Sequence, residues 1–306
     1  MKNTDIYIIR GFANGWIKPS PPKERTGKTV GIIGSGPAGL TVASKFAKSN
    51  LDLIIIPGGE FKITQKNQNL YKGIIDKDIS HEPLDENRHK VFGGSGNYWG
   101  GRCLPLDKID FEKRSWISNT GWPIKINELN PYYKLASKLL KLNRFNFEFD
   151  PNIIPSDKNE IIEGLDNNNL TSKKLERWSS LLNFSNEFKN LFLKKNFTLL
   201  NNAHVNKINA SAEKVDSVSC IIEDKKVLVK AKLFVLASGG IENPRLLLAS
   251  KNSLHPKGIG NKKNLVGRYY MSHHTGIFLN LNPYNRKKIL FKYEKDLNGV
   301  YCRRRW

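Results

Sequence analysis

The feature that most constrains this chain is a glycine-rich turn between an apolar strand and an apolar helix. Residues 29–40 read TVGIIGSGPAGL, in which an apolar, β-branched run leads into GxGxxG. Residues 40–47 then carry apolar side chains at helical spacing. In that context the glycines permit a tight turn, close approach of a pyrophosphate and close helix packing, while free N–H groups of the helix face the anion. We predict a dinucleotide site formed by Gly34, Ser35, Gly36, Pro37, Ala38 and Gly39.

Length and composition favour a globular protein. The chain has 306 residues, which is enough for one large domain or two of ordinary size. No apolar run approaches the roughly 20 residues of a membrane span, and the N-terminus lacks the apolar stretch of a signal peptide. A soluble, cytoplasmic protein without a membrane span is therefore expected. Cys103, Cys220 and Cys302 are far apart, so they predict neither a metal site nor a disulfide framework.

The formal charge of +22 raises the question of an anionic partner. The basic residues are spread along the chain among Asn and Ile rather than gathered in one arm. There is no zinc-finger or aromatic ribonucleoprotein motif either. We therefore expect no nucleic-acid partner, because a few of these charges are enough to attract an anionic cofactor or substrate.

The second strand of the predicted βαβ unit ends without the expected acid. Residues 51–56 read LDLIII, a buried-strand pattern. In this fold a carboxylate at the strand's end accepts hydrogen bonds from the adenosine ribose. Pro57 holds that place, and Glu60 follows three positions later. Either Glu60 reaches the ribose around the intervening glycines, or the ribose is held less well.

Residues 90–107 form a second glycine-rich stretch. Five glycines and a serine lie within nine residues, which permits unusual backbone angles and close backbone approach, and a tryptophan adds a large flat surface. The stretch is either an ordinary tight loop or, after a βαβ unit, a flavin-contacting loop. The predicted cofactor contacts here are Gly93, Gly94, Ser95, Asn97, Trp99 and Gly100.

Residues 233–250 form another passage in which a predicted strand leads through a glycine turn into a helix. Residues 233–237 form a predicted buried strand, and Asn243-Pro244 begins a helix that ends near Ser250. Such a turn points backbone N–H groups at cofactor phosphates or ribose, although a purely structural turn fits as well. The predicted contacts are Ala237, Ser238, Gly239 and Asn243. Further strands are predicted at residues 197–200, 217–222 and 227–229, with a hairpin at 223–226.

Between these passages the pattern predicts a mainly helical insertion at residues 126–195. Asn130 caps a helix with Pro131 in its first turn, and apolar residues at helical spacing follow. Trp178 and Phe188 fall in expected helical segments of a region rich in Asn and Lys. This insertion carries no chemical motif.

Several separate blocks resemble the glucose-methanol-choline (GMC) oxidoreductases, FAD enzymes that act on alcohols and sugars. They read NQNLYKG (67–73), FGGSGNYWGGRCLPLDKIDFEKRSWI (92–117), GWPIKINELNPYYKLA (121–136), FVLASGGIENPRLLLAS (234–250) and VGRYYMSHH (266–274), in the family's order. The resemblance implies a cofactor contact by the backbone of Val205. It also implies noncovalent FAD, because Asn97 and Tyr98 stand where covalent relatives carry a histidine.

The resemblance implies a catalytic histidine in a C-terminal part that this chain does not reach. That histidine would remove the hydroxyl proton while hydride passes to the flavin. His273 and His274 are the weak candidates present, because they do not match the family's catalytic positions. We therefore expect a chain that is truncated at its C-terminus and whose activity is uncertain.

A second resemblance covers roughly the first 40 residues. Residues 8–40 look like the segment that leads into the first flavin domain of the glutamate synthase small subunit. A flavin electron-transfer subunit of that kind is therefore one alternative, although the chain contains no second GxGxxG for NADPH. The other alternative is a non-catalytic FAD-binding fragment or interaction module.

The expected architecture is α/β, a Rossmann-like FAD-binding domain of GMC type with an incomplete substrate domain. Residues 1–27 are an N-terminal extension, residues 28–125 and 196–270 the FAD-binding domain, and residues 271–306 the start of the substrate domain. The expected partners are an alcohol or sugar substrate and an unidentified electron acceptor.

Overall fold

The computed structural model has a mixed α/β fold that divides into two compact units. It describes residues 28–118, 120–156, 160–164, 166, 171–181, 183–271 and 292–305. The first unit comprises Met1–Asn97 and Asn183–Ser272, and the second comprises Tyr98–Leu182 and His273–Trp306. The first segment of the first unit thus ends at Asn97, whereas the first segment of the predicted FAD-binding domain runs to residue 125. The functional names given to the predicted domains stay predictions.

A four-stranded parallel sheet forms the centre of the first unit. Its strands are β1 (Thr29–Ile33), β2 (Asp52–Ile56), β5 (Phe197–Leu199) and β9 (Leu233–Leu236), in the order β5-β2-β1-β9. β1 pairs with both β2 and β9, so Ile33 lies beside Ile56 on one side and beside Leu236 on the other. These four strands confirm the sequence prediction. Because the strands are parallel, the loops that follow β1, β2 and β9 emerge at the same edge.

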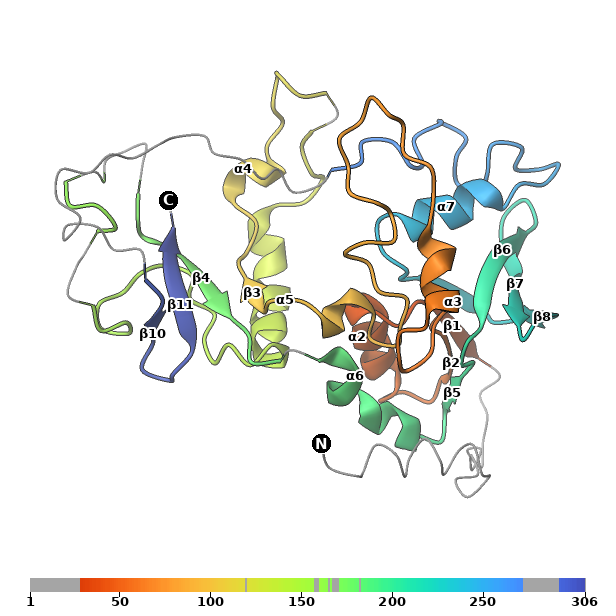
Figure 1. The fold of residues 1–306 in the computed structure, drawn as a ribbon, viewed down its shortest axis with the longest axis horizontal. Helices are drawn as coiled ribbons and strands as arrows, with labels where there is room; N and C mark the ends of the chain where they lie inside the picture. Colours follow the sequence, from red (N-terminus) through yellow and green to blue (C-terminus); the bar gives the residue numbers. More distant parts are fainter. Residues whose placement is uncertain are drawn as a thin grey trace. The chain divides into compact units, whose positions relative to one another are not determined.

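The helix α2 (Pro37–Phe46) follows β1 after a turn of three residues and packs on β1 and β2 (Figure 1). Pro37 begins the helix, where its missing N–H and fixed φ are favourable. Leu40 and Ala43 are buried, and Ile32 and Ile55 are fully buried in the strands. The apolar run therefore forms a buried parallel strand pair that is covered by one helix face.

A three-stranded antiparallel sheet completes the core of the first unit. It consists of β6 (His204–Ala210), β7 (Val215–Ile222) and β8 (Lys225–Val229), which lie side by side in that order (Figure 1). Glu223 and Asp224 have φ values of 47° and 63° and form the turn between β7 and β8. The predicted hairpin is confirmed, with Lys225 and Lys226 in the strand rather than in the turn. The helix α7 (Glu242–Ala249) packs on β6, close to its predicted bounds.

The segments that connect the strands of the first unit contain short helices. They are α3 (Gln65–Gln68), η1 (Asn69–Tyr71), η2 (Gly94–Asn97), α6 (Phe184–Glu187) and η3 (Lys189–Leu193). Within the described part of the chain, none of the helices is both long enough and apolar enough to span a bilayer.

The second unit is built on an antiparallel sheet with the order β10-β11-β4-β3. Its elements are β3 (Arg102–Cys103), α4 (Lys108–Phe111), α5 (Ile126–Leu139), β4 (Lys174–Trp178), β10 (Glu294–Lys295) and β11 (Tyr301–Arg305). The strand β4 pairs with β3 on one side and with β11 on the other. Arg177 of β4 therefore lies between Cys103 of β3 and Cys302 of β11.

Two predictions for residues 126–195 are wrong. The helix α5 begins at Ile126 and not at Asn130, because the Glu128 carboxylate accepts a hydrogen bond from the Lys125 N–H at 2.7 Å and so closes the helix start earlier. Pro131 consequently lies inside the helix. Trp178 lies in the strand β4 and not in a helix, because β4 pairs with β11 more than 100 residues away and local propensity does not report such partners.

The sheet of the second unit encloses paired charges. Arg177 donates to Asp296 at 2.6 Å, and both side chains are 0% exposed. Glu176 accepts from Arg102 and, at 2.8 Å, from Arg303. Asp296 also accepts from the backbone N–H groups of Asn298 and Val300, so its carboxylate closes the turn before β11. A buried ion pair is tolerated only when hydrogen bonds satisfy both partners, and removing one partner leaves an uncompensated charge.

We expect Arg177→Met to lower the free energy of unfolding of the second unit by about 3–5 kcal/mol, since it strands the Asp296 carboxylate. Adding Asp296→Asn should recover part of the loss, because the amide oxygen still accepts the turn's N–H groups. The measurement is urea unfolding monitored by fluorescence.

The control is Lys174→Met, which breaks the exposed ion pair with Glu148 and should cost under about 1 kcal/mol. Equal losses for Arg177→Met and Lys174→Met would contradict the account of the buried pair.

Candidate dinucleotide-binding site

Three glycine-containing turns meet at the carboxyl edge of the parallel sheet. The turn after β1 is bonded to the end of β2 by the Gly34 N–H, which donates to the Ile56 carbonyl at 2.9 Å. The turn after β9 is bonded to β1 by the Ala237 N–H, which donates to the Ile33 carbonyl at 2.7 Å. The second glycine stretch closes against the first through the Gly93 N–H, which donates to the Ser35 carbonyl at 3.0 Å. Segments that the sequence separates by up to 200 residues thus form one site.

Each glycine of the GxGxxG turn has a distinct steric environment. Gly34 has φ +108°, and a Cβ there would lie 2.3 Å from the Ala237 carbonyl oxygen. A Cβ on Gly39 would lie 2.1 Å from the Gly34 carbonyl oxygen, so α2 touches β1 backbone to backbone. Gly36 differs, because nothing lies within 4 Å of its Cβ position. The first and third glycines are therefore needed for packing, while the second presents an open backbone surface.

The open surface is lined by groups that suit an anion. Gly36 caps α2 without a side-chain hydrogen bond, so the N–H groups of the first turn are free to face a ligand. Ser35 is 2% exposed, and its hydroxyl has no hydrogen-bond partner among the described residues. Gly239 and Gly240 also have empty space at their Cβ positions. An orphaned hydroxyl beside open glycine backbone fits a pyrophosphate.

The second glycine stretch is fixed by its own polar side chains. The Asn97 amide donates to the Phe92 carbonyl at 2.8 Å and to the Ser185 hydroxyl at 2.7 Å, and its oxygen accepts the Ser185 N–H. The Ser95 hydroxyl accepts the His89 N–H at 3.1 Å and donates to the Asn87 carbonyl. Both side chains are engaged within the protein. Their contribution to a cofactor site is therefore to shape the loop, whose backbone at Gly93 and Gly94 has positive φ.

The third turn has a similar internal support. The Asn243 side chain accepts the Ser238 N–H at 2.9 Å, and the Ser238 hydroxyl donates to the Ile33 carbonyl at 3.0 Å. Val205 lies in β6, opposite Cys220, and packs against the core cluster that contains Ile56. These predicted residues lie in the same unit as the glycine turn, and their contact with a cofactor stays a prediction.

The structure does not determine where four predicted residues lie relative to this site. Trp99 and Gly100 belong to the second unit, where the Trp99 indole N–H donates to the Leu181 carbonyl at 3.1 Å. His273 and His274 lie outside the described residues. Their predicted roles stay predictions.

A lysine and a histidine at the end of β2 were missed by sequence reasoning. A Cβ on Gly58 would lie 3.3 Å from the Lys90 ammonium nitrogen. Burial lowers the pKa of Lys90 to about 8, opposed by the negative charge of Glu242. Burial and the positive charge of Lys90 lower the pKa of His204, opposed by the Gly58 backbone beside its ring. Its Nδ1 atom is buried, with no hydrogen-bond partner of good geometry among the described residues. The basic run before the second glycine stretch was the available signal.

The carboxylate of Glu242, whose negative charge acts on Lys90, is already engaged. Glu242 accepts from Arg88 at 3.2 Å and from Arg245 at 2.7 Å. The guanidinium of Arg88 and the ammonium of Lys90 both lie over the ring of Tyr71, at 4.3 Å and 4.8 Å from its centroid. Burial and Glu242 raise the pKa of Tyr71, so its hydroxyl stays neutral. Glu60, the predicted ribose ligand, contributes its backbone carbonyl to the Phe92 N–H at 2.7 Å.

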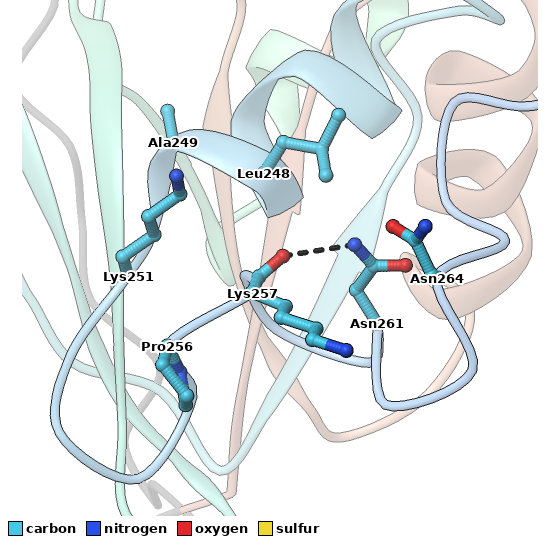
Figure 2. Close-up of a pocket in the computed structure, with 7 residues that line it drawn as sticks. All are labelled: Leu248, Ala249, Lys251, Pro256, Lys257, Asn261 and Asn264. Carbon is cyan, nitrogen blue, oxygen red and sulfur yellow. Dashed lines mark hydrogen bonds between the residues drawn. The ribbon is translucent and has the colours of Figure 1, made fainter.

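A surface hollow at the other end of α7 is separate from this site. Figure 2 shows its lining residues, none of which is a predicted cofactor contact: Leu248, Ala249, Lys251, Pro256, Lys257, Asn261 and Asn264. The Asn261 amide donates to the Lys257 carbonyl at 2.9 Å, and its oxygen accepts the Val266 N–H. Asn261 therefore holds two turns of the loop together, which gives the hollow a structural explanation.

The fold and the glycine turn are those of a Rossmann-like α/β protein. Residues 168–275 match the family model of the GMC oxidoreductases. Paromamine 6′-oxidase of Streptomyces fradiae is 24% identical over 290 residues, which are 78% of this chain and 52% of that protein. The fructose dehydrogenase large subunit of Gluconobacter japonicus is 53% identical over 45 residues, 15% of this chain and 8% of that protein. The chain is thus similar to the GMC oxidoreductases over part of its length.

A second relationship is also present. The glutamate synthase [NADPH] small chain of Bacillus subtilis is 41% identical over 85 residues, 26% of this chain and 17% of that protein. Both predicted resemblances are thereby confirmed, although the glutamate synthase match spans 85 residues rather than the predicted 40 or so. The matched segments span about half or less of the length of these relatives.

The glycine turn can be tested with a matched pair of substitutions. Gly39→Ala should lower the free energy of unfolding by about 3 kcal/mol, because its methyl group meets the Gly34 carbonyl. Gly36→Ala should leave the melting temperature unchanged, because φ is −70° and the space is open. It should nevertheless weaken dinucleotide binding about tenfold or more, since the methyl group stands on the surface that the anion must approach.

Thermal unfolding and equilibrium titration with FAD measure the two effects. Unchanged FAD affinity in Gly36→Ala would contradict the assignment of the open surface.

Proposed function

We propose that the chain is an FAD-dependent oxidoreductase of GMC type that oxidises the CH–OH group of an alcohol or sugar. The observation that carries the proposal is the meeting of the three glycine turns, with the open backbone of Gly36 and the orphaned hydroxyl of Ser35. The family match over residues 168–275 supports the same reaction class. When bound, the flavin supplies the acceptor for a hydride from the substrate carbon.

The chain's own contribution is to bind and orient the dinucleotide. The N–H groups of the first turn of α2 and the Ser35 hydroxyl hold the pyrophosphate in this proposal. The backbone at Gly94 lies against Gly36, because a Cβ on Gly94 would be 3.3 Å from the Gly36 Cα. In this proposal the Gly94 backbone limits how far the cofactor can move. Ser238 and Gly239 contribute backbone groups from the third turn. The full proposed set is Gly34, Ser35, Gly36, Pro37, Ala38, Gly39, Glu60, Gly93, Gly94, Ser95, Asn97, Trp99, Gly100, Val205, Ala237, Ser238, Gly239 and Asn243.

The remaining parts of the proposal rest on the sequence. FAD is proposed to bind noncovalently, because Asn97 and Tyr98 stand where covalent relatives carry a histidine. His273 and His274 are proposed only as weak candidates for the base. A cytoplasmic location and an unidentified electron acceptor complete the proposal.

Two alternatives are kept. A chain that binds FAD but does not turn over is supported by the mismatch between His273 and His274 and the family's catalytic positions. A flavin electron-transfer segment is supported by the glutamate synthase match.

The first experiment is to purify the chain and record its absorption spectrum. Protein with a flavin spectrum and FAD released by denaturation is expected. Anaerobic bleaching by a panel of sugars and primary alcohols then tests the reaction. Bleaching by one member supports the proposed function, and a flavin that no alcohol or sugar bleaches supports the non-catalytic alternative. A folded chain that neither retains nor binds FAD would overturn the proposal.

A further inference from the structure

We propose that the carboxyl end of β2 carries a cationic subsite that binds a phosphate group on the ribose of an adenine nucleotide. Its residues are the cation Lys90, whose ammonium lies at Gly58, and the neutral imidazole of His204. The inference goes beyond the proposed function, because it assigns to the same glycine site a second ligand class, the 2′-phosphorylated adenine nucleotides, which would compete with FAD.

The position of the subsite in the fold is the first argument. In doubly wound sheets the end of the second strand lies beside the adenosine ribose, and the side chains there decide which ribose is bound. Here that strand end is tied to the glycine turn through the bond from the Gly34 N–H to the Ile56 carbonyl. Gly58 follows two residues later, and the Lys90 ammonium lies 3.3 Å from its Cβ position. The cation therefore lies where the fold places its ribose ligand.

The sign of the charge is the second argument. A free ribose is bound by a carboxylate, whereas a ribose 2′-phosphate requires a cation. Pro57 removes the carboxylate from this strand end. Lys90 makes no ion pair with any described residue, and the neighbouring Glu242 is shared between Arg88 and Arg245. The net charge beside this strand end is therefore positive. A positive charge favours a ribose with an anionic substituent over the unmodified ribose that a carboxylate would bind.

The energetic state of the cluster is the third argument. The Lys90 ammonium lies 4.8 Å from the centroid of the Tyr71 ring, and burial lowers its pKa because desolvation disfavours the charged form. The Nδ1 atom of His204 is buried beside the Gly58 backbone and has no hydrogen-bond partner of good geometry in the described part of the chain. Groups held in this way are typical of ligand sites, because a bound anion satisfies them.

The test compares two probes that differ by one phosphate. Adenosine 2′,5′-bisphosphate and adenosine 5′-monophosphate are titrated into the full chain at pH 7 by calorimetry. We expect the bisphosphate to bind at least about tenfold more tightly than the monophosphate, because a charge-assisted hydrogen bond to the extra phosphate would have that effect. Lys90→Met should remove most of this preference, and the exposed Lys48→Met should leave it unchanged.

Dependence on pH gives an independent readout. The preference should fall as pH rises from 7 through 9, because Lys90 loses its proton at about pH 8. Tyr71 and His204 do not change charge in this range, because the pKa of Tyr71 is raised and the pKa of His204 is lowered. The other charged groups beside Lys90 are Arg88, Arg245 and Glu242, which pair with one another. The 2′-phosphate stays dianionic above its second pKa of about 6.

Thermal stability separates a binding role from a structural one. If Lys90 serves a ligand, Lys90→Met should melt at the same temperature as the parent or higher, because it removes a charge whose burial is unfavourable. A lower melting temperature together with an unchanged preference for the bisphosphate would make Lys90 a packing residue and overturn the inference.

The outcomes for the two proposals are distinguishable. Equal affinity for the two probes in a chain that binds FAD would overturn the subsite and leave the proposed function standing. A strong bisphosphate preference in a chain that does not bind FAD would support the subsite and overturn the proposed function. Displacement of bound FAD by the bisphosphate, but not by the monophosphate at equal concentration, is the result expected if both hold.

Discussion

The structure of the first unit depends on backbone packing at Gly34 and Gly39, where no side chain fits. A Cβ at either position would lie within 2.3 Å of a carbonyl oxygen, of Ala237 in one case and of Gly34 in the other. This contact brings α2 down onto β1 and sets the turn after β9 against the turn after β1. The open surface at Gly36 and the orphaned hydroxyl of Ser35 follow from it, since both lie between the two tightly packed glycines. Packing thus creates the site before any ligand is present.

The charge around this site is unevenly distributed, and its sign influences which ligand the site can bind. The glycine turn offers N–H groups to a pyrophosphate, as any dinucleotide requires. The strand end beside it presents Lys90 and His204 instead of an acid, and both have pKa values lowered by burial. A positive charge at this strand end favours an anionic substituent on the ribose. The cofactor proposal and the subsite proposal therefore concern neighbouring parts of the same sheet edge.

The two units are stabilised in different ways. The first unit buries aliphatic side chains of its parallel sheet and hairpin, such as Ile33, Ile56 and Val218. The second unit buries Arg177 and Asp296 as a pair and neutralises Glu176 between two arginines. Much of the net positive charge of the chain is thus spread over the surface, while the buried charges of the second unit are matched. Composition alone did not reveal this division, because it counts charges without their partners.

The sequence by itself determined the local elements whose signals lie within a few residues. These include the strand, glycine turn and helix around Gly34, the parallel strand at 52–56, and the turn before α7, because sterics and hydrophobic periodicity act locally. Only the tertiary structure decided what depends on distant partners. Trp178 became a strand residue because it pairs with Arg102 of β3 in a strand that also pairs with β11, and Lys90 reached Gly58 across the fold. Long-range pairing and burial set these features, and no pattern of neighbouring residues encodes them.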